Sequence, residues 1–322
     1  MNEKFVEIIN DMADVLNAAQ LKRLQEVLLK HLVKDETEKK NISNQEYLTK
    51  FLEAKKIEGC SERTIKYYRV TVEQLLRKVL DPIRKVTTEQ MREYLVDYQK
   101  INNCGKTTID NVRRNISSFF SWLEEEDYIL KSPMRRIHKI RAEKLVKNVI
   151  NDEDIERLRD GCDCLRDVAM IDLLYSTGIR VGELVRLNRS NINFSERECV
   201  VFGKGDKERR VYFDAKSKIH LINYLKSRTD DNPALFVSLD RPYSRLKISG
   251  VEIRLRQLGR KLNLDRVHPH KFRRSMATRA IDKGMPIEQV QKILGHSQID
   301  TTMQYAIVNQ NNVKAAHRKY IS

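Results

Sequence analysis

Residues 268–305 read HPHKFRRSMATRAIDKGMPIEQVQKILGHSQIDTTMQY, and this stretch decides the fold of the second half of the chain. Pro269 suits the first position of a helix, and Gly284 stands where that helix would end. Pro286 and Gly295 delimit a second short helix in the same way. The pattern therefore predicts three short helices in succession.

Several side chains on these helices can hold or attack a phosphate. His270 and Arg273 are three residues apart, so they share one helix face near the positive end of the first helix. His296 follows the second helix, and Tyr305 ends the third, which we expect Asp300 to cap. Each residue alone also has an ordinary explanation, since Tyr305 is one of twelve tyrosines. The spacing nevertheless favours an anion-binding helix.

Three residues upstream extend this interpretation. Arg180 follows Gly178 in YSTGIRVGELVRL and is expected at the start of a helix, where a guanidinium adds a bidentate fork to the anion preference of the helix. Glu183 lies on the same face and could hold Arg180 or a neighbouring group, although a surface ion pair at this spacing is common. Lys204 is expected at a hairpin tip, from which a flexible cation could reach into a groove.

The composition indicates a polyanionic partner. The 322 residues carry 61 Lys and Arg against 45 Asp and Glu, a net charge of +16. Residues 1–43 hold 7 basic and 8 acidic groups, whereas residues 44–150 hold 22 against 15 and residues 151–322 hold 32 against 22. An excess on the last two segments favours nucleic acid first. With no long apolar run and no secretion signal, we expect a cytoplasmic protein without membrane contact.

The cysteines favour free thiols over a metal centre. Their number is odd, and no second pair accompanies the two that are closest in sequence, so we predict no metal site. No P-loop pattern and no carboxylate cluster occur either. The five residues are Cys60, Cys104, Cys162, Cys164 and Cys199.

We expect a helical N-terminal extension and a four-helix domain. Residues 1–43 contain amphipathic helices broken near Asn17, followed by a charged linker. They either pack on the body of the protein or contact another protein, and the segment 1–40 is the candidate for that contact. Residues 44–140 show apolar side chains every three to four positions, with Ser61 and Thr88 as helix caps.

The fourth helix of this domain carries a candidate DNA-binding face. It begins near Lys106, and a solvated face without ligand is the competing explanation. The residues we expect to contact phosphates are Lys106, Thr107, Thr108, Arg113 and Arg114.

The remainder is predicted as a linker and a mostly helical domain. Residues 141–150 are polar, basic and poorly periodic, which is typical of a linker. In residues 151–322, short strands near 191–195, 199–203 and 209–213 interrupt the helices. The fold class is thus mainly α, with a small antiparallel sheet in the second domain.

Taken together, these motifs resemble the catalytic domain of the tyrosine recombinases, the phage integrase family. The resemblance rests on TGIRVGEL, FGKGDKERRV, HPHKFRRSMAT and LGHSQIDTTMQY in this order, with 24 residues from Arg180 to Lys204 and 9 from His296 to Tyr305. It covers residues 44–322, because the four-helix segment is similar to the SAM-like core-binding domain of the family. The first 43 residues fall outside it.

The resemblance implies a mechanism and a set of roles. Tyr305 would attack a DNA phosphodiester and form a 3′-phosphotyrosine, while Tyr320 is expected to be only a tail residue. Lys204 would protonate the leaving 5′-oxygen. Arg180 and Arg273 would clamp the phosphate oxygens, and Glu183 would orient the site. His296 would hydrogen-bond the same phosphate, and His270 would either do so too or help take the tyrosine proton. Because one ester is exchanged for another, the resemblance implies no cofactor. His268 and Arg274 flank the motif residues and are expected to be structural or DNA-facing.

The family also implies partners and leaves alternatives open. We expect double-stranded recombination sites as the substrate and a homotetramer on two sites, with the tail after Tyr305 exchanged between protomers. The N-terminal extension favours an integrase of a mobile element, and Xer-like resolution of chromosome or plasmid dimers is the alternative. Relaxation by a type IB topoisomerase and a non-catalytic DNA-binding protein are further alternatives.

Overall fold

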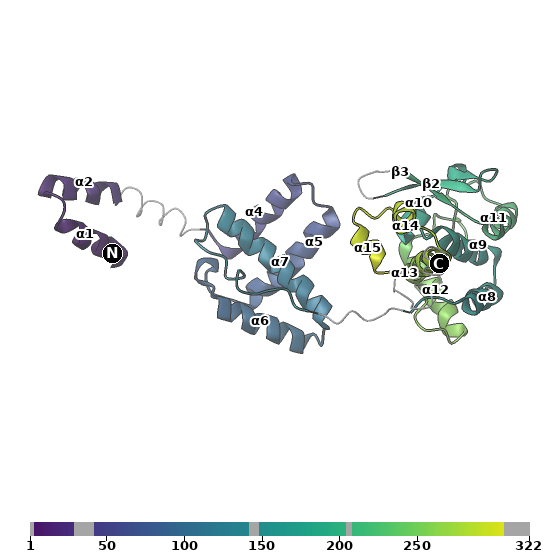
Figure 1. The fold of residues 1–322 in the computed structure, drawn as a ribbon, viewed down its shortest axis with the longest axis horizontal. Helices are drawn as coiled ribbons and strands as arrows, with labels where there is room; N and C mark the ends of the chain where they lie inside the picture. The colour runs from purple at the N-terminus through teal and green to yellow at the C-terminus, as the bar shows by residue number, and fades with distance from the viewer. Residues whose placement is uncertain (1–2, 29–41, 142–147, 204–207, 306–322) are drawn as a thin grey trace, which may run out of the picture. The chain divides into compact units, whose positions relative to one another are not determined.

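The computed structural model describes residues 3–28, 42–141, 148–203 and 208–305. Its Cα atoms form two compact units, residues 1–145 and residues 146–322. The described part is mainly helical, with one small antiparallel sheet in the second unit (Figure 1), as the sequence predicts.

The N-terminal extension forms two helices that contact each other. α1 (Glu3–Ala13) and α2 (Ala18–Leu28) are separated near Asn17, whose side chain accepts a hydrogen bond from the Gln20 amide at 3.0 Å. The break predicted near Asn17 is thereby confirmed. No residue of α2 is buried, and Val15 between the helices is 74% exposed.

Among the described residues that follow α2, four helices and one 3₁₀ turn build the rest of the first unit. They are α4 (Asn44–Ile57), α5 (Glu62–Lys78), η2 (Ile83–Lys85), α6 (Thr88–Ile101) and α7 (Lys106–Glu125). Ser61 caps α5 as predicted, but Thr87 and not Thr88 caps α6. Thr87 forms a capping box with Gln90, whereas the Thr88 hydroxyl donates to the Pro133 carbonyl at 2.9 Å. The prediction was one residue off because two adjacent threonines can both cap.

The core of this unit is aromatic. Phe51 packs edge-on against Phe119 at 5.2 Å between ring centroids and lies 5.7 Å from Trp122. Phe51 and Phe119 are fully buried. Helices α4 and α7 therefore share one continuous hydrophobic contact, which fixes the outer face of α7.

The second unit contains eight helices, one 3₁₀ turn and three strands among the residues described. They are α8 (Asp152–Asp160), α9 (Leu165–Thr177), α10 (Val181–Arg186), η3 (Arg189–Asn191), β1 (Ile192–Asn193), β2 (Glu198–Phe202), β3 (Glu208–Tyr212), α11 (Ala215–Lys226), α12 (Ile248–Lys261), α13 (Pro269–Asp282), α14 (Ile287–Leu294) and α15 (Ile299–Met303). The antiparallel sheet has the order β1-β2-β3, with Cys199 opposite Val211.

Helix α9 is the central element of this unit. It packs against α8, α11, α13 and β3, and most of its apolar residues are buried, although Leu165 in its first turn is 48% exposed. A helix buried on several faces belongs in a core. Its buried Asp172 is neutralised by Arg159, whose Nε donates to the carboxylate at 2.6 Å. The C-terminal end of α9 therefore has a fixed position from which the site is built.

The three helices predicted from residues 268–305 are present. Pro269 opens α13, Pro286 and Gly295 delimit α14, and α15 follows. The expected cap at Asp300 was wrong: Gln298 precedes α15 and Asp300 lies within its first turn. Helix α14 contacts α13, α15 and β3.

Candidate active site

The first part of the site is the turn that ends α9. Gly178 has a φ of 63°, a left-handed conformation that glycine adopts without a steric penalty. A Cβ at this position would overlap the methyl group of Met276. The free carbonyl of Gly178 accepts a hydrogen bond from Arg273 Nη1 at 2.7 Å. The helix end thus provides an acceptor for an arginine 95 residues later in the chain.

Arg180 and Glu183 form the start of α10, as predicted. The Glu183 carboxylate accepts from the Arg180 amide at 2.8 Å and from Arg180 Nη1 at 3.1 Å. Arg180 Nη2 also donates to the Gly295 carbonyl at 3.3 Å. Glu183 is buried, whereas the Arg180 side chain is 39% exposed. The buried carboxylate therefore holds an arginine whose guanidinium remains open to a ligand.

Arg273 is the buried arginine of the site. It is 3% exposed, and its Nη2 donates to the Leu294 carbonyl at 2.6 Å and lies 2.9 Å from His296 Nε2. Burial and the nearby charge of Arg180 lower the pKa of Arg273 to about 10, so it remains a cation at neutral pH. Because Leu294 and Gly295 are adjacent, the two arginines bind successive carbonyls at the end of α14.

His296 connects Arg273 to the last helix. Its Nδ1 lies 2.9 Å from the hydroxyl of the buried Thr302, and Gln291 donates to its carbonyl at 3.0 Å. Partial burial, followed by the charges of Arg273 and Arg180, lowers the pKa of His296 to about 4. The imidazole is neutral at pH 7, accepts from Arg273 through Nε2 and donates from Nδ1 to Thr302.

Tyr305 follows α15 and lies beside His296. The two ring centroids are 6.0 Å apart at an interplanar angle of 28°, a stacked arrangement. The tyrosine ring is half-buried against the cluster of Ala277, Val290 and Leu294. The structure therefore brings the predicted nucleophile next to the predicted phosphate-binding residues.

His270 occupies the N-terminal turn of α13 and remains exposed. Partial desolvation, followed by the positive charges of Arg273, Arg180 and Arg274, lowers its pKa. A neutral imidazole can accept a proton or a hydrogen bond. The flanking Arg274 instead donates to the Asn148 carbonyl at 3.0 Å.

Arg209 on β3 is a site residue that our sequence interpretation missed. Its Nη1 and Nη2 donate to the two Glu183 oxygens at 2.6 and 2.7 Å, and its Nε donates to the Ile293 carbonyl at 2.9 Å. A signal was available: Arg209 alternates with the buried Val211 and so points to the inner face of the strand. An arginine on an inner face requires a buried acceptor.

The remaining predictions concern Lys204, the tail, a metal site and membrane contact. Lys204 and the tail after Tyr305, including Tyr320, lie outside the described residues. Within the described residues, no group of three or more His, Cys, Asp or Glu side chains could hold a metal ion. No described helix is long and apolar enough to span a membrane.

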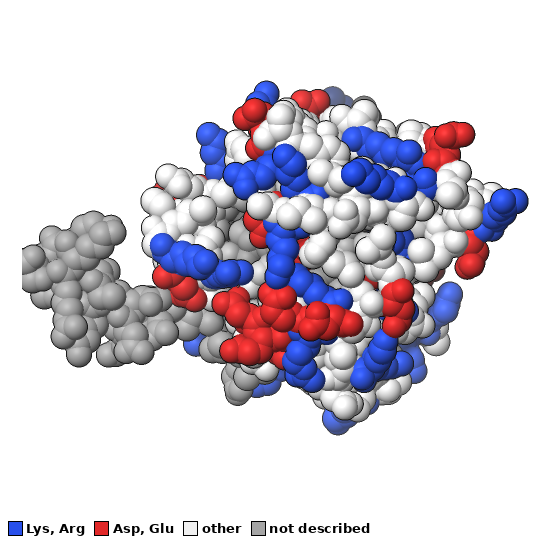
Figure 2. Space-filling model, turned by 90° about the vertical axis from the view of Figure 1, so that its right-hand side faces the viewer, with Lys and Arg blue, Asp and Glu red and all other residues white. Residues whose placement is uncertain are grey.

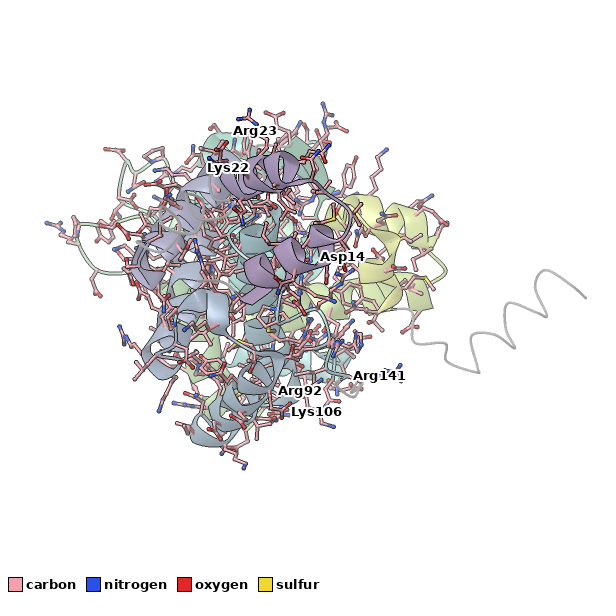
Figure 3. The ribbon with its side chains drawn as sticks, turned by 90° about the vertical axis from the view of Figure 1, so that its left-hand side faces the viewer. Asp14, Lys22, Arg23, Arg92, Lys106 and Arg141 are labelled. Atoms are coloured by element: carbon pink, nitrogen blue, oxygen red, sulfur yellow. The ribbon has the colours of Figure 1, made fainter. Side chains whose placement is uncertain are left out.

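The predicted DNA-binding residues lie along α7 of the first unit. Lys106, Thr107 and Arg114 are exposed, and Lys106 is labelled at the helix start in Figure 3. Arg113 differs, because its Nε donates to Asp110 at 2.8 Å and both side chains are 12% exposed. Asp110 also accepts from the Ile140 amide at 2.9 Å. The Arg113 guanidinium is therefore engaged within the domain, while Arg114 is accessible.

One face of the second unit carries charges of both signs. Figure 2 shows acidic side chains gathered into a patch there, with Lys and Arg around it. Helix α8 contributes three acidic residues to this unit in its first turn, Asp152, Glu153 and Asp154. A mixed face of this kind is less suited to a DNA backbone than the arginine-lined site.

The arrangement is suited to phosphoryl transfer. Two guanidiniums are held by backbone carbonyls and a buried carboxylate, and a neutral histidine and a tyrosine lie beside them. Fixed cations stabilise the charge on phosphoryl oxygens without reorganising during the reaction. The described residues therefore bring two guanidiniums that can bind a phosphate close to a phenol that can act as an oxygen nucleophile.

Comparison with known proteins agrees with this chemistry. The model of the phage integrase family matches residues 136–312, and the phage integrase N-terminal SAM-like domain matches residues 47–130. Tyrosine recombinase XerC of Oceanobacillus iheyensis is 29% identical over 293 residues, covering 85% of this chain and 95% of that protein.

Solved structures share the fold. An integrase of transposon Tn1549 in complex with transposon right end DNA has a TM-score of 0.72 at 19% identity, covering 86% of this chain and 99% of that one. A lambda integrase tetramer bound to a Holliday junction has a TM-score of 0.68 at 18% identity, covering 84% and 82%. With the family model matching more than half of the sequence, the chain belongs to the phage integrase family and is a tyrosine-type site-specific recombinase.

Proposed function

We propose that this recombinase cleaves and rejoins DNA strands through a 3′-phosphotyrosyl intermediate on Tyr305. The observation that carries the proposal is the convergence of Arg180, Arg273 and His296 on the end of α14, with the Tyr305 ring stacked beside His296. These residues come from three separate sequence motifs, and the fold brings them to one place.

Each role follows from the chemistry of the side chain. Tyr305 Oη attacks the phosphorus, the bond to the 5′-oxygen breaks, and Lys204 gives its proton to that oxygen. His270 accepts the tyrosine proton or hydrogen-bonds the phosphate. Arg180 and Arg273 stabilise the non-bridging oxygens. His296 bonds the same phosphate once DNA has bound, when its Nε2 leaves Arg273 and carries the ring proton. One ester replaces another, so a 5′-hydroxyl from a second strand can reverse the step.

A covalent adduct is the direct test. A pool of nicked duplexes with random core sequences is incubated with the chain in EDTA, and adducts are separated in SDS. We expect a protein–DNA adduct that Tyr305→Phe abolishes and Tyr320→Phe retains. Adduct formation by Tyr305→Phe would refute the nucleophile assignment, and inhibition by EDTA would require a metal-dependent mechanism instead.

DNA binding by both units is part of the proposal. The basic excess lies in residues 44–150 and 151–322, which could hold a duplex together, with Lys106, Thr107 and Arg114 contacting phosphates in the first unit. The tetramer seen for lambda integrase on a Holliday junction supports a homotetramer on two sites. Exchange of the tail after Tyr305 between protomers is the corresponding expectation for the last residues.

We assign protein contact, rather than DNA contact, to residues 1–40. The extension is nearly neutral in charge, and the apolar side chains of α1 and α2 remain partly or fully exposed where described. Short isolated helices are marginal in water and need a packing partner. Deleting residues 1–40 should change assembly or recombination and leave core-site affinity unaltered. A large loss of DNA affinity would contradict this assignment.

For the biological role, we propose integration or excision of a mobile element, with Xer-like dimer resolution as the second candidate. The similarity to tyrosine recombinase XerC favours the second. The sequences recovered in covalent adducts decide between them. Sites that flank the coding region together with transposon or phage genes indicate a mobile element, whereas one chromosomal site remote from the gene indicates dimer resolution.

A topoisomerase activity gives a different result. The enzyme should relax a supercoiled plasmid poorly when the plasmid lacks the sequences recovered in covalent adducts, because a site-specific recombinase cleaves only at its own site. Efficient relaxation of such a plasmid would favour the type IB topoisomerase alternative.

A further inference from the structure

Arg209 joins two parts of the candidate site that are distant in sequence. Through Glu183 it contacts the start of α10, where the same carboxylate holds Arg180. Through the Ile293 carbonyl it contacts the end of α14, three residues before His296. All three of its guanidinium nitrogens therefore donate hydrogen bonds within 2.9 Å.

The position of Arg209 on its strand explains how it reaches both elements. It pairs with Val201 of β2, and it shares its face of β3 with the fully buried Val211. The side chain of the next residue, Arg210, points the other way. Its Nη1 forms an ion pair with Glu198 Oε1 at 3.3 Å, and the side chain is 68% exposed. The Arg209 side chain is only 13% exposed. Two adjacent arginines thus lie in opposite environments.

The geometry at Gly295 adds a further constraint. A Cβ on Gly295 would lie 3.0 Å from Arg209 Cδ and 3.1 Å from its Nε, closer than ordinary contacts allow. The carbonyl of this glycine accepts from Arg180. The Arg209 side chain therefore packs directly beneath the backbone that holds Arg180.

We propose that Arg209 is a positioning residue for strand cleavage: by holding the Glu183 carboxylate and the end of α14, it keeps Arg180 and His296 in one arrangement. This inference rests on the proposed function of the site. Glu183 is buried and acts on Arg180 through its charge, so the second arginine also keeps that carboxylate ionised. Because all three guanidinium nitrogens of Arg209 already donate to protein acceptors, we assign it no contact with the DNA phosphate.

A purely structural ion pair is the competing interpretation. Under that interpretation, replacing Arg209 lowers activity only in proportion to the loss of folded protein. A positioning residue instead changes the cleavage rate of folded enzyme, because a displacement of about 1 Å in a catalytic group costs roughly 100-fold in rate. It also changes how the rate depends on pH, because Glu183 is the group that Arg209 contacts.

The test uses the full chain and a nicked duplex selected by the wild-type enzyme. Single-turnover adduct formation, DNA affinity and circular dichroism are measured for Arg209→Gln, Arg209→Lys and the matched control Arg210→Gln. We expect Arg209→Gln to cleave roughly 100-fold more slowly at unchanged DNA affinity. Arg209→Lys should fall between it and the wild type, because an ammonium cannot span both carboxylate oxygens. Arg210→Gln should behave as the wild type.

The pH profile separates the two interpretations. In the wild type, burial raises the pKa of Glu183, but hydrogen bonds from Arg209 and the Arg180 amide outweigh it and hold the pKa below its ordinary value. Without Arg209, burial is less opposed and Glu183 takes up a proton at a higher pH. Arg209→Gln should therefore lose further rate as the pH falls through the weakly acidic range, where the wild type keeps this carboxylate charged.

Three results would overturn the inference. The first is equal cleavage rates for Arg209→Gln and Arg210→Gln. The second is a loss of cleavage rate in Arg209→Gln that equals its fraction of unfolded protein. The third is a pH dependence of the Arg209→Gln rate that runs parallel to that of the wild type. If Arg209→Gln does not fold, the rates of Arg209→Lys and of Glu183→Gln decide, since the two changes should be non-additive when combined. A wild-type chain that forms no adduct on any duplex refutes the proposed function itself.

Discussion

His296 shows how single atoms fix a protonation state in this site. Arg273 has only donors, so the His296 Nε2 that lies 2.9 Å from its Nη2 must be an acceptor. The proton of the neutral ring therefore resides on Nδ1, which faces the Thr302 hydroxyl. This tautomer depends on three side chains from α13, the end of α14 and α15.

The tautomer and pKa of His296 can be measured directly. NMR spectra of histidine-labelled protein, assigned with His296→Gln, should show an Nδ1-protonated ring at pH 7 with a midpoint near 4. Because the pKa is lowered, the ring stays neutral from pH 7 to pH 5 and is protonated only below that range. The hydrogen bond from Arg273 is lost at that point. Titration near the ordinary value of about 6.5 would contradict the described environment.

At the scale of helices and turns, the left-handed end of α9 supports the arginine clamp. Replacing Gly178 by Ala should lower the free energy of unfolding by about 1–2 kcal/mol, because a side chain at φ 63° is strained. Gly182→Ala is the matched control, since its added Cβ would meet only Ile248 at 4.0 Å. The chain's one tryptophan, Trp122, lies in the first unit. Gly178→Ala should therefore shift the circular dichroism transition and leave the tryptophan transition unchanged.

Helix α7 offers a second matched pair at this scale. Arg114 is exposed, so Arg114→Ala should reduce the slope of log affinity against log salt by about 1 without loss of stability. Arg113→Ala removes a charged hydrogen bond from Asp110 and should cost about 1.5–3 kcal/mol of stability. Tryptophan fluorescence during denaturation reports the second effect. Equal salt slopes for Arg114→Ala and wild type would remove Arg114 from the DNA-binding face.

The sequence predicts elements better than the contacts between them. Periodicity, prolines and glycines predict α13, α14 and the start of α7, because these signals act within one helix. The cap of α6 was misplaced by one residue because Thr87 and Thr88 are chemically equivalent candidates. Arg209 was missed because its partner, Glu183, lies 26 residues away on another element. Only the fold brings that carboxylate to the inner face of β3.

For the whole molecule, the uneven charge determines how it should bind DNA. The net charge of +16 lies outside residues 1–43, on the two segments that follow them. A protein making 6–10 phosphate contacts loses roughly 10³–10⁵ in affinity between 50 and 200 mM salt. We expect a loss in this range for the full chain and the same salt dependence after deletion of residues 1–40. Binding that is insensitive to salt would contradict phosphate contacts as the main source of affinity.

The arginine clamp has a consequence for how this enzyme tolerates mutation. Four of the acceptors that hold Arg180, Arg209 and Arg273 are main-chain carbonyls, at Gly178, Ile293, Leu294 and Gly295. A substitution at such a position leaves the carbonyl in place as long as the backbone conformation is unchanged. Substitution of the half-buried Ile293 can therefore preserve the clamp. Leu294 is constrained by its burial in the core, and the two glycines are constrained by the backbone conformation that they set.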